Sequence, residues 1–139
     1  ISIDMSEFNT FIRQNVGNIA SPSFKFNPAA VSDLVFSAGS LPPLYDVDIP
    51  SAAGLSLTFV WDNTYLTELR NVNDEVSIIL YNITTDTIAI HETVALFTAG
   101  TVAVEANASA GDSVACFICT HSALKTAYSN SQYVDTVVI

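Results

Sequence analysis

The segment Leu55-Ser56-Leu57-Thr58-Phe59-Val60-Trp61 alternates large apolar side chains with mostly small or polar ones. Because successive side chains of a β-strand point to opposite faces, this alternation predicts a strand with one face in a hydrophobic core. Trp61 is in phase with Phe59, and we expect both rings in that core. Further strands are predicted near residues 24–26, 31–36, 45–49, 75–82, 87–92, 101–106, 112–120 and 132–138.

Turn signals separate these segments. Gly100 and Gly111 mark two tight turns, and residues 62–74, rich in Asn, Asp and Thr, form the longest expected loop. Residues 37–43 contain two prolines and predict a break, because proline cannot donate to a central strand ladder. Short alternating strands between turns are typical of a sandwich. We therefore predict an all-β, immunoglobulin-like antiparallel β-sandwich of about eight or nine short strands.

The first segment of the chain has a helical period instead. Asp4 and Glu7 match a capping box, and the pattern predicts an amphipathic helix over about residues 5–17. At 139 residues the chain is expected to form one domain. In it, residues 1–20 pack on the sandwich or swap between sandwiches, and residues 22–139 form the sandwich itself. The apolar residues with helical spacing are Met5, Phe8, Phe11, Ile12, Val16 and Ile19.

The charge is strongly negative. Fourteen acidic residues face four basic ones, for a net charge of −10. Such a surface repels phosphate backbones, so we expect no nucleic-acid partner. No apolar run approaches the roughly 18 residues that a membrane helix needs, so we expect no membrane span.

The localisation expected from the sequence is outside the cell. Few Lys and Arg leave few sites for trypsin-like proteases, as suits an extracellular, cell-surface or virion-surface protein. The sequence shows no signal peptide and begins at Ile1 rather than Met, which suggests a processed or shortened chain.

Cys116 and Cys119 form a C-x-x-C motif within the strand predicted near 112–120. Residues three apart on a strand point to opposite faces, so the two sulfurs should lie too far apart to bond. We expect two separate buried thiols rather than a redox pair.

Several segments carry a family resemblance through their order and spacing, namely Met5-Ser6-Glu7-Phe8-Asn9, residues 35–41, Thr58-Phe59-Val60-Trp61-Asp62-Asn63, Asn73-Asp74, Tyr81-Asn82, residues 110–114 and residues 129–134. Taken together, they resemble the C-terminal two-thirds of an uncharacterised family of Bacteroidota proteins, a domain of unknown function. The resemblance implies no known activity and supplies no catalytic residue.

Three Asp-Ser/Thr-apolar triplets are candidate O-glycosylation sites in a bacterial lineage of that kind. Their acceptor residues are Thr87, Ser113 and Thr136, each near a predicted turn or chain end. The alternative is that each triplet is an ordinary entry into a strand.

No other constellation points to chemistry. His91 and His121 are the only histidines, and His91 should face solvent. A zinc site needs three or four converging ligands, and no G-x-S-x-G motif anchors a hydrolase triad. We expect no cofactor, no bound metal and no enzymatic activity.

The sequence leaves two functions open. The first is a structural subunit that self-assembles as a homo-oligomer, a filament or a virion component. Its contacts would be made by the terminal segments, through Ile1, Ile3, Phe8 and Ile12 at one end and Val137 and Ile139 at the other. The second is a monomeric module that presents loops 62–74 and 121–131 to a glycan or a protein.

Overall fold

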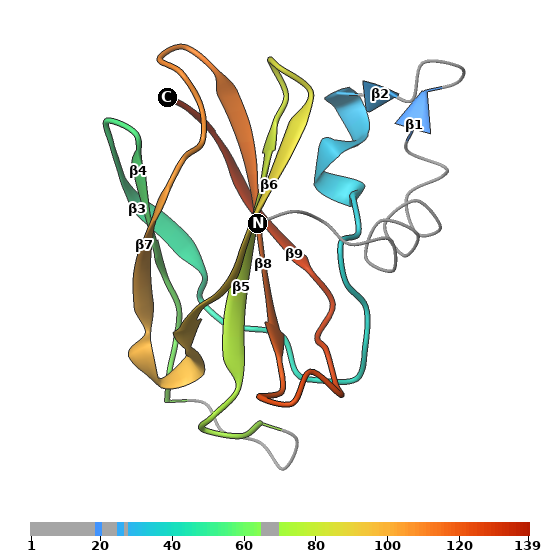
Figure 1. Cartoon of the computed structure of the whole chain (residues 1–139), viewed down its shortest axis with the longest axis vertical. Coiled ribbons are helices and arrows are strands. Elements are labelled where there is room, and N and C mark those ends of the chain that lie inside the picture. Colours follow the sequence, from blue (N-terminus) through green and yellow to red (C-terminus); the bar gives the residue numbers. More distant parts are fainter. Residues whose placement is uncertain (1–18, 21–24, 27, 65–69) are drawn as a thin grey trace.

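Seven antiparallel strands form two sheets in the computed structural model, which describes residues 19–20, 25–26, 28–64 and 70–139 (Figure 1). The three-stranded sheet has the order β3 (Asp48–Ala53), β4 (Ser56–Val60), β7 (Thr101–Glu105). The four-stranded sheet has the order β6 (Thr87–Leu96), β5 (Glu75–Asn82), β8 (Ser113–His121), β9 (Gln132–Val138). The sequence prediction of an all-β sandwich is confirmed, and the bounds of β5 and β9 agree with it to the residue.

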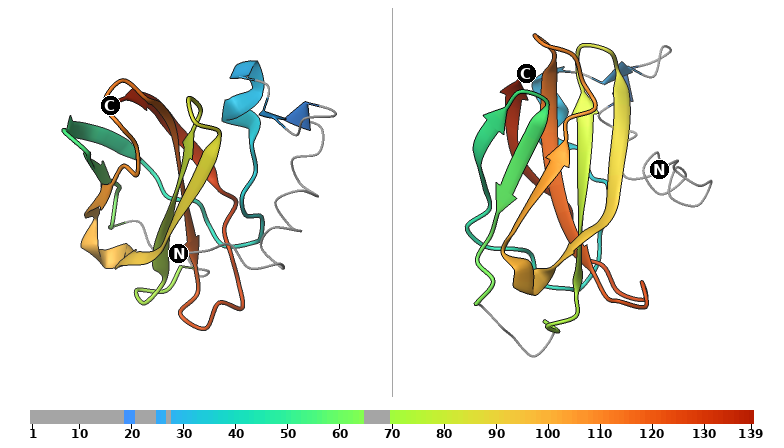
Figure 2. Two further views of the ribbon diagram at one scale, coloured as in Figure 1. Left: turned by 45° about the horizontal axis from the view of Figure 1, so that its top comes forward. Right: turned by 60° about the vertical axis from the view of Figure 1, so that its left-hand side comes forward.

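Three smaller elements complete the described chain. The two-residue strands β1 (Ile19–Ala20) and β2 (Lys25–Phe26) pair with each other, apart from the sandwich. The 3-10 helix η2 (Pro28–Asp33) follows them, and η3 (Phe97–Ala99) connects β6 to β7. The two views of Figure 2 show how β6 leads into η3 and on into the other sheet. The predicted helix over residues 5–17 and the residues Ile1, Ile3, Phe8 and Ile12 lie outside the described residues.

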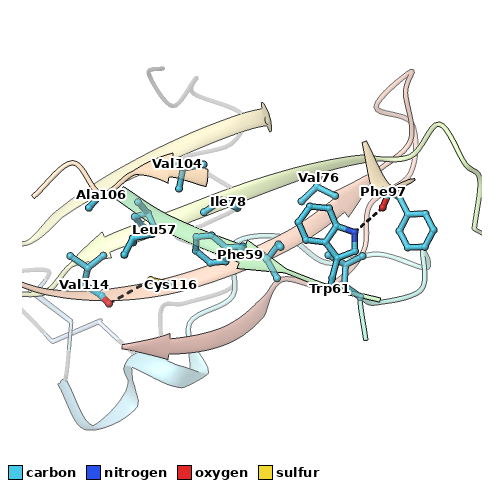
Figure 3. Close-up of a cluster of buried hydrophobic side chains, with 13 residues drawn as sticks. Leu57, Phe59, Trp61, Val76, Ile78, Phe97, Val104, Ala106, Val114 and Cys116 are labelled. Carbon is cyan, nitrogen blue, oxygen red and sulfur yellow. Dashed lines mark hydrogen bonds between the residues drawn. The ribbon is translucent and has the colours of Figure 1, made fainter. Parts of the chain in front are cut away.

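The main core lies between the two sheets. Leu57 and Phe59 from β4 pack against Ile78 from β5 and Ile118 from β8, and Trp61 closes one end of the cluster (Figure 3). The apolar residues whose alternation predicted β4 therefore form the inward face of a sandwich strand. The expectation that Trp61 and Phe59 lie in the core is confirmed.

The strands β5 and β8 are buried on both faces. Their other face carries a second apolar cluster, which includes Ile79, Tyr81 and Phe117. Leu34 belongs to that cluster, and the Phe36 ring lies 4.8 Å from the Phe117 ring, edge to face. Central strands covered on both sides read as nearly continuous apolar runs, as β5 and β8 do.

The strand predicted at residues 31–36 is wrong. The helix η2 ends at Asp33, and residues 34–36 continue without strand pairing. The apolar residues of this segment pack on the outer face of the four-stranded sheet and do not belong to a strand ladder. They are Val31, Leu34 and Phe36.

The strand predicted at residues 45–49 also differs, because β3 begins at Asp48 and runs through Pro50 to Ala53. β3 is an edge strand, and its register with β4 shifts between Asp48 and Ser51. At an irregular edge position proline deprives no ladder of a hydrogen bond, so the strand continues past it.

Residues 36–44 are hydrogen-bonded along residues 128–132. Ser131 donates its backbone N–H to Ser37 O (3.0 Å), and Leu41 donates its own to Tyr128 O (3.1 Å). The Gln132 side chain accepts from Leu44 N and donates to Leu44 O, both at 2.9 Å. The predicted break at residues 37–43 is thus confirmed as a non-sheet segment, but its path is fixed.

At Gly39 the backbones of these two hydrogen-bonded segments come close together. A Cβ added there would lie 2.1 Å from the backbone oxygen of Tyr128. At Gly54, by contrast, the φ of +62° is the only obstacle, since nothing lies within 4 Å of an added Cβ.

We predict that Gly39→Ala lowers the free energy of unfolding more than Gly54→Ala does. The first variant must push two backbone segments apart, whereas the second incurs only a left-handed backbone cost of about 1–2 kcal/mol. Urea denaturation of both variants measures the difference. Equal losses would contradict the close approach.

Candidate binding surface at one end of the sandwich

A hollow of about 260 Å³ lies where the loop before β5 meets the loop after β8. These are the two loops that the sequence predicted for a binding module. The lining consists of amide, hydroxyl and aliphatic groups together with the carboxylate of Asp74. The lining residues are Asn71, Asn73, Asp74, Ser122, Ala123, Leu124 and Thr126.

The carboxylate of Asp74 is neutralised by a buried ion pair. Arg70 Nη1 lies 3.0 Å from Asp74 Oδ2, and the two residues are 7% and 2% exposed. The same Nη1 donates to Thr120 Oγ1 on β8 (3.0 Å), and Nη2 donates to the carbonyls of Pro42 and Pro43. The guanidinium therefore joins the loop before β5, the end of β8 and the segment that leads into β3.

The other sheet is joined to this point through Phe97. The Arg70 guanidinium lies over the Phe97 ring, 4.9 Å from its centroid. Phe97 donates its N–H to Asp74 O (2.8 Å) and accepts the indole N–H of Trp61 (2.8 Å, Figure 3). No local sequence pattern predicts this network, because it depends on residues brought together from five separate segments.

The loop after β8 is organised by Ser122. Its Oγ accepts the N–H groups of Thr126 (3.0 Å) and Ala127 (3.1 Å), and its carbonyl accepts that of Lys125 (2.8 Å). This tight turn, with Lys125 at φ +57°, projects Leu124 into solvent at 85% exposure. Val72, in the facing loop, is 49% exposed. Leu124 thus lines a largely neutral hollow, and the exposed Val72 lies in sequence between two other lining residues, Asn71 and Asn73.

A polar cluster lies behind the loop. His121 Nε2 lies 3.0 Å from Ser77 Oγ, and Nδ1 lies 3.5 Å from Glu75 Oε1. The residue types are those of a hydrolase triad. However, Ser77 and His121 are only 5% and 2% exposed, and Ser77 Oγ also accepts the N–H of Thr93 (2.9 Å). In this conformation the hydroxyl bridges two strands and offers no approach to a substrate.

The cysteine prediction is confirmed within the described residues. Cys116 faces the core between the sheets, Cys119 faces the outer cluster, and both are free thiols. Burial raises the pKa of Cys116 to about 12, with a smaller contribution from the charge of Asp135. Burial likewise raises the pKa of Cys119 to about 11.

We predict that neither thiol reacts with Ellman's reagent in the native protein at pH 8, because thiolate is the reactive form and both pKa values lie well above that pH. Two thiols should react once the chain is unfolded in guanidinium. Rapid modification of the native protein would contradict the burial of both side chains.

The candidate glycosylation residues lie toward the opposite end of the four-stranded sheet. Thr87 begins β6 and is exposed, Ser113 begins β8, and Thr136 lies near the end of β9. The Thr136 hydroxyl shares a hydrogen bond with the hydroxyl of Tyr133 (2.7 Å), so it is already engaged. Use of these sites stays a prediction.

The proposed C-terminal contact residues lie against the chain's own core. Val137 and Ile139 are partly buried against the cluster between the sheets, whereas Val138 between them is 69% exposed. Ile139 also donates its N–H to Asp112 O (2.9 Å). Of this pair of side chains, neither is fully free for a neighbour.

His91 lies at the surface of β6 and pairs with Asn107, whose Oδ1 is 2.7 Å from Nε2. Among the residues that the structure describes, no group of three or more His, Cys, Asp or Glu side chains could hold a metal ion. In the same part of the chain, no helix is long and apolar enough to cross a membrane.

No protein-family model and no curated protein matches the chain. Among solved structures, it is similar to the twitchin kinase region from C. elegans (Fn31-NL-kin-CRD-Ig26), at a TM-score of 0.53 and 14% sequence identity. The match covers 74% of this chain but only 17% of that one. At this identity the similarity shows a shared β-sandwich fold and nothing of the kinase activity.

Proposed function

We propose that the chain is a non-catalytic, immunoglobulin-like recognition module that binds a protein partner at the end of the sandwich carrying residues 70–74 and 121–128. The hollow between these loops, lined in part by the exposed side chain of Leu124, is the observation that carries the proposal. The three-plus-four strand arrangement and the twitchin match support the immunoglobulin-like assignment.

A protein partner is favoured over a glycan by the side chains present. Exposed apolar groups rimmed by polar residues mark protein interaction sites when they form a patch. Among the residues that the structure describes, those that line the hollow include no aromatic ring on which a sugar could stack. The neutral lining also avoids leaving a buried charge without a partner when a second protein covers it.

The loops are also held in a way that suits binding. The ion pair of Arg70 and Asp74 fixes one wall, and the Ser122 turn fixes the other. A surface that is ordered before it binds loses less conformational entropy on association.

We predict that Leu124→Ser weakens binding of selected ligands at least about tenfold, which corresponds to about 1.4 kcal/mol. The ligands come from a random peptide library displayed on phage and screened against the chain, with a glycan array screened in parallel. Leu55→Ser is the matched control, because Leu55 is 49% exposed in the hairpin between β3 and β4, at the far end of the sandwich. Both substitutions should leave the free energy of unfolding within about 0.5 kcal/mol of its original value.

Three outcomes would contradict the proposal: no peptide ligand, ligands that bind both variants equally, or ligands found only on the glycan array. The third would replace the protein partner with a saccharide at the same or another surface.

A self-assembling structural subunit outside the cell is the second candidate. β9 is an edge strand of the described sheet and exposes Val138, and an unprotected apolar edge invites strand pairing. Light scattering tests it: a homo-oligomer that Val138→Lys dissociates would favour assembly, and a monomer at all concentrations would contradict it.

A further inference from the structure

We propose that protonation of His121 releases the 122–127 loop and so regulates the binding surface. The inference rests on the proposed function for its purpose, but its structural basis is independent of any partner. It arises from the position of His121, which is buried at the last residue of β8, directly before the loop that lines the hollow.

The hydrogen-bond partners define the neutral form of the ring. Nδ1 lies 3.2 Å from the carbonyl oxygen of Ser122, which can only accept, so Nδ1 carries the proton. Nε2 then accepts from the hydroxyl of Ser77 at 3.0 Å. Ser77 Oγ in turn accepts the N–H of Thr93, so each of these groups has a partner in the neutral state.

This series of hydrogen bonds ends on β6 at a strained β-bulge. Val76 pairs with Ala95 but Ile78 pairs with His91, so residues 92–94 lie opposite Ser77 alone. Thr93, in that bulge, has a φ of +51°, which is an outlier for a β-branched side chain. Strain of this kind persists only where surrounding contacts hold it, and here Ser77 and Glu75 provide them, the latter by accepting from Thr93 Oγ1 (3.2 Å).

Protonation changes this arrangement at two points. Nε2 becomes a donor toward Ser77 Oγ, so the bond between them reverses and the Ser77 hydroxyl hydrogen loses its acceptor at a buried site where little water can replace it. The positive ring is also attracted to the carboxylate of Glu75, 3.5 Å from Nδ1. A shift of Nδ1 toward Glu75 weakens its bond to Ser122 O, and Ser122 is the residue that organises the whole turn.

Other charged and titratable groups lie on the elements packed near the ring. Glu92 of β6 forms an ion pair with Lys125 of the loop. Tyr128 places its ring 5.6 Å from the imidazole and forms a backbone bridge with His121. Among the described residues, Glu75 is therefore the carboxylate that directly faces the imidazole.

Nuclear magnetic resonance of the free, full chain tests the inference between about pH 8 and pH 5, the range in which histidine changes charge in proteins. The two histidine rings are assigned with His91→Gln and His121→Gln. We expect the backbone amides of residues 122–127 to titrate with the same midpoint as the His121 ring. This response should vanish in His121→Gln and persist in His91→Gln, the matched control on the surface of β6.

Glu75→Gln is the second variant, should His121→Gln fail to fold. This variant removes the charge beside the ring but keeps the ring itself. The titration midpoints of the ring and of the loop amides should therefore shift by the same number of pH units. The inference is overturned if the ring titrates without the loop amides, if their response survives in His121→Gln, or if the ring stays neutral until the protein unfolds.

Because this titration needs no ligand, it separates the two proposals. A coupled loop without any peptide ligand leaves the regulation standing and removes the function. Peptides that depend on Leu124 but bind equally in wild type and His121→Gln at every pH leave the function standing and remove the regulation.

Discussion

The buried ion pair of Arg70 and Asp74 is the interaction on which the loop end of the structure depends. A guanidinium removed from water needs hydrogen-bond partners, and here a carboxylate and a threonine hydroxyl accept from Nη1 while two proline carbonyls accept from Nη2. These partners belong to different segments, so the charge cannot be satisfied unless the segments meet. The position of Phe97 above the guanidinium extends the requirement to the second sheet.

A second constraint acts on the rest of the molecule. Since β5 and β8 are apolar on both faces, one face requires the three-stranded sheet and the other requires the residues around Leu34 and Phe36. Hydrogen bonds between residues 36–44 and residues 128–132 hold the residues around Leu34 and Phe36 against the outer face of the four-stranded sheet. Gly39 permits the close approach of the two segments. The two apolar faces of β5 and β8 therefore account both for the packing of the two sheets and for the position of the segment around Leu34 and Phe36. The candidate binding surface begins where these strands end, next to the ion pair.

Sequence reasoning succeeded where the signal is local. The period-two alternation located β4, β5, β8 and β9, the glycines located turns, and the spacing of Cys116 and Cys119 predicted their opposite faces. It failed at residues 31–36, because apolar residues that cover a sheet resemble those within one, and at Pro50, because edge position and register are properties of the assembled sheet. The clusters of Arg70 and His121 could not be predicted either. Each is assembled through hydrogen bonds between residues as far as 44 or 50 positions apart, and a single sequence does not specify the strand register that joins them.

The binding surface and its aliphatic rim presuppose that the ion pair holds the loop before β5 in one arrangement. A double-mutant cycle of Arg70→Met and Asp74→Asn, followed by urea denaturation, tests this most directly. Each single variant leaves one buried polar partner unsatisfied and should cost about 3–5 kcal/mol, while the double variant should cost clearly less than the sum. Single losses below about 1 kcal/mol that add without coupling are the behaviour of an exposed pair, and they would contradict the account.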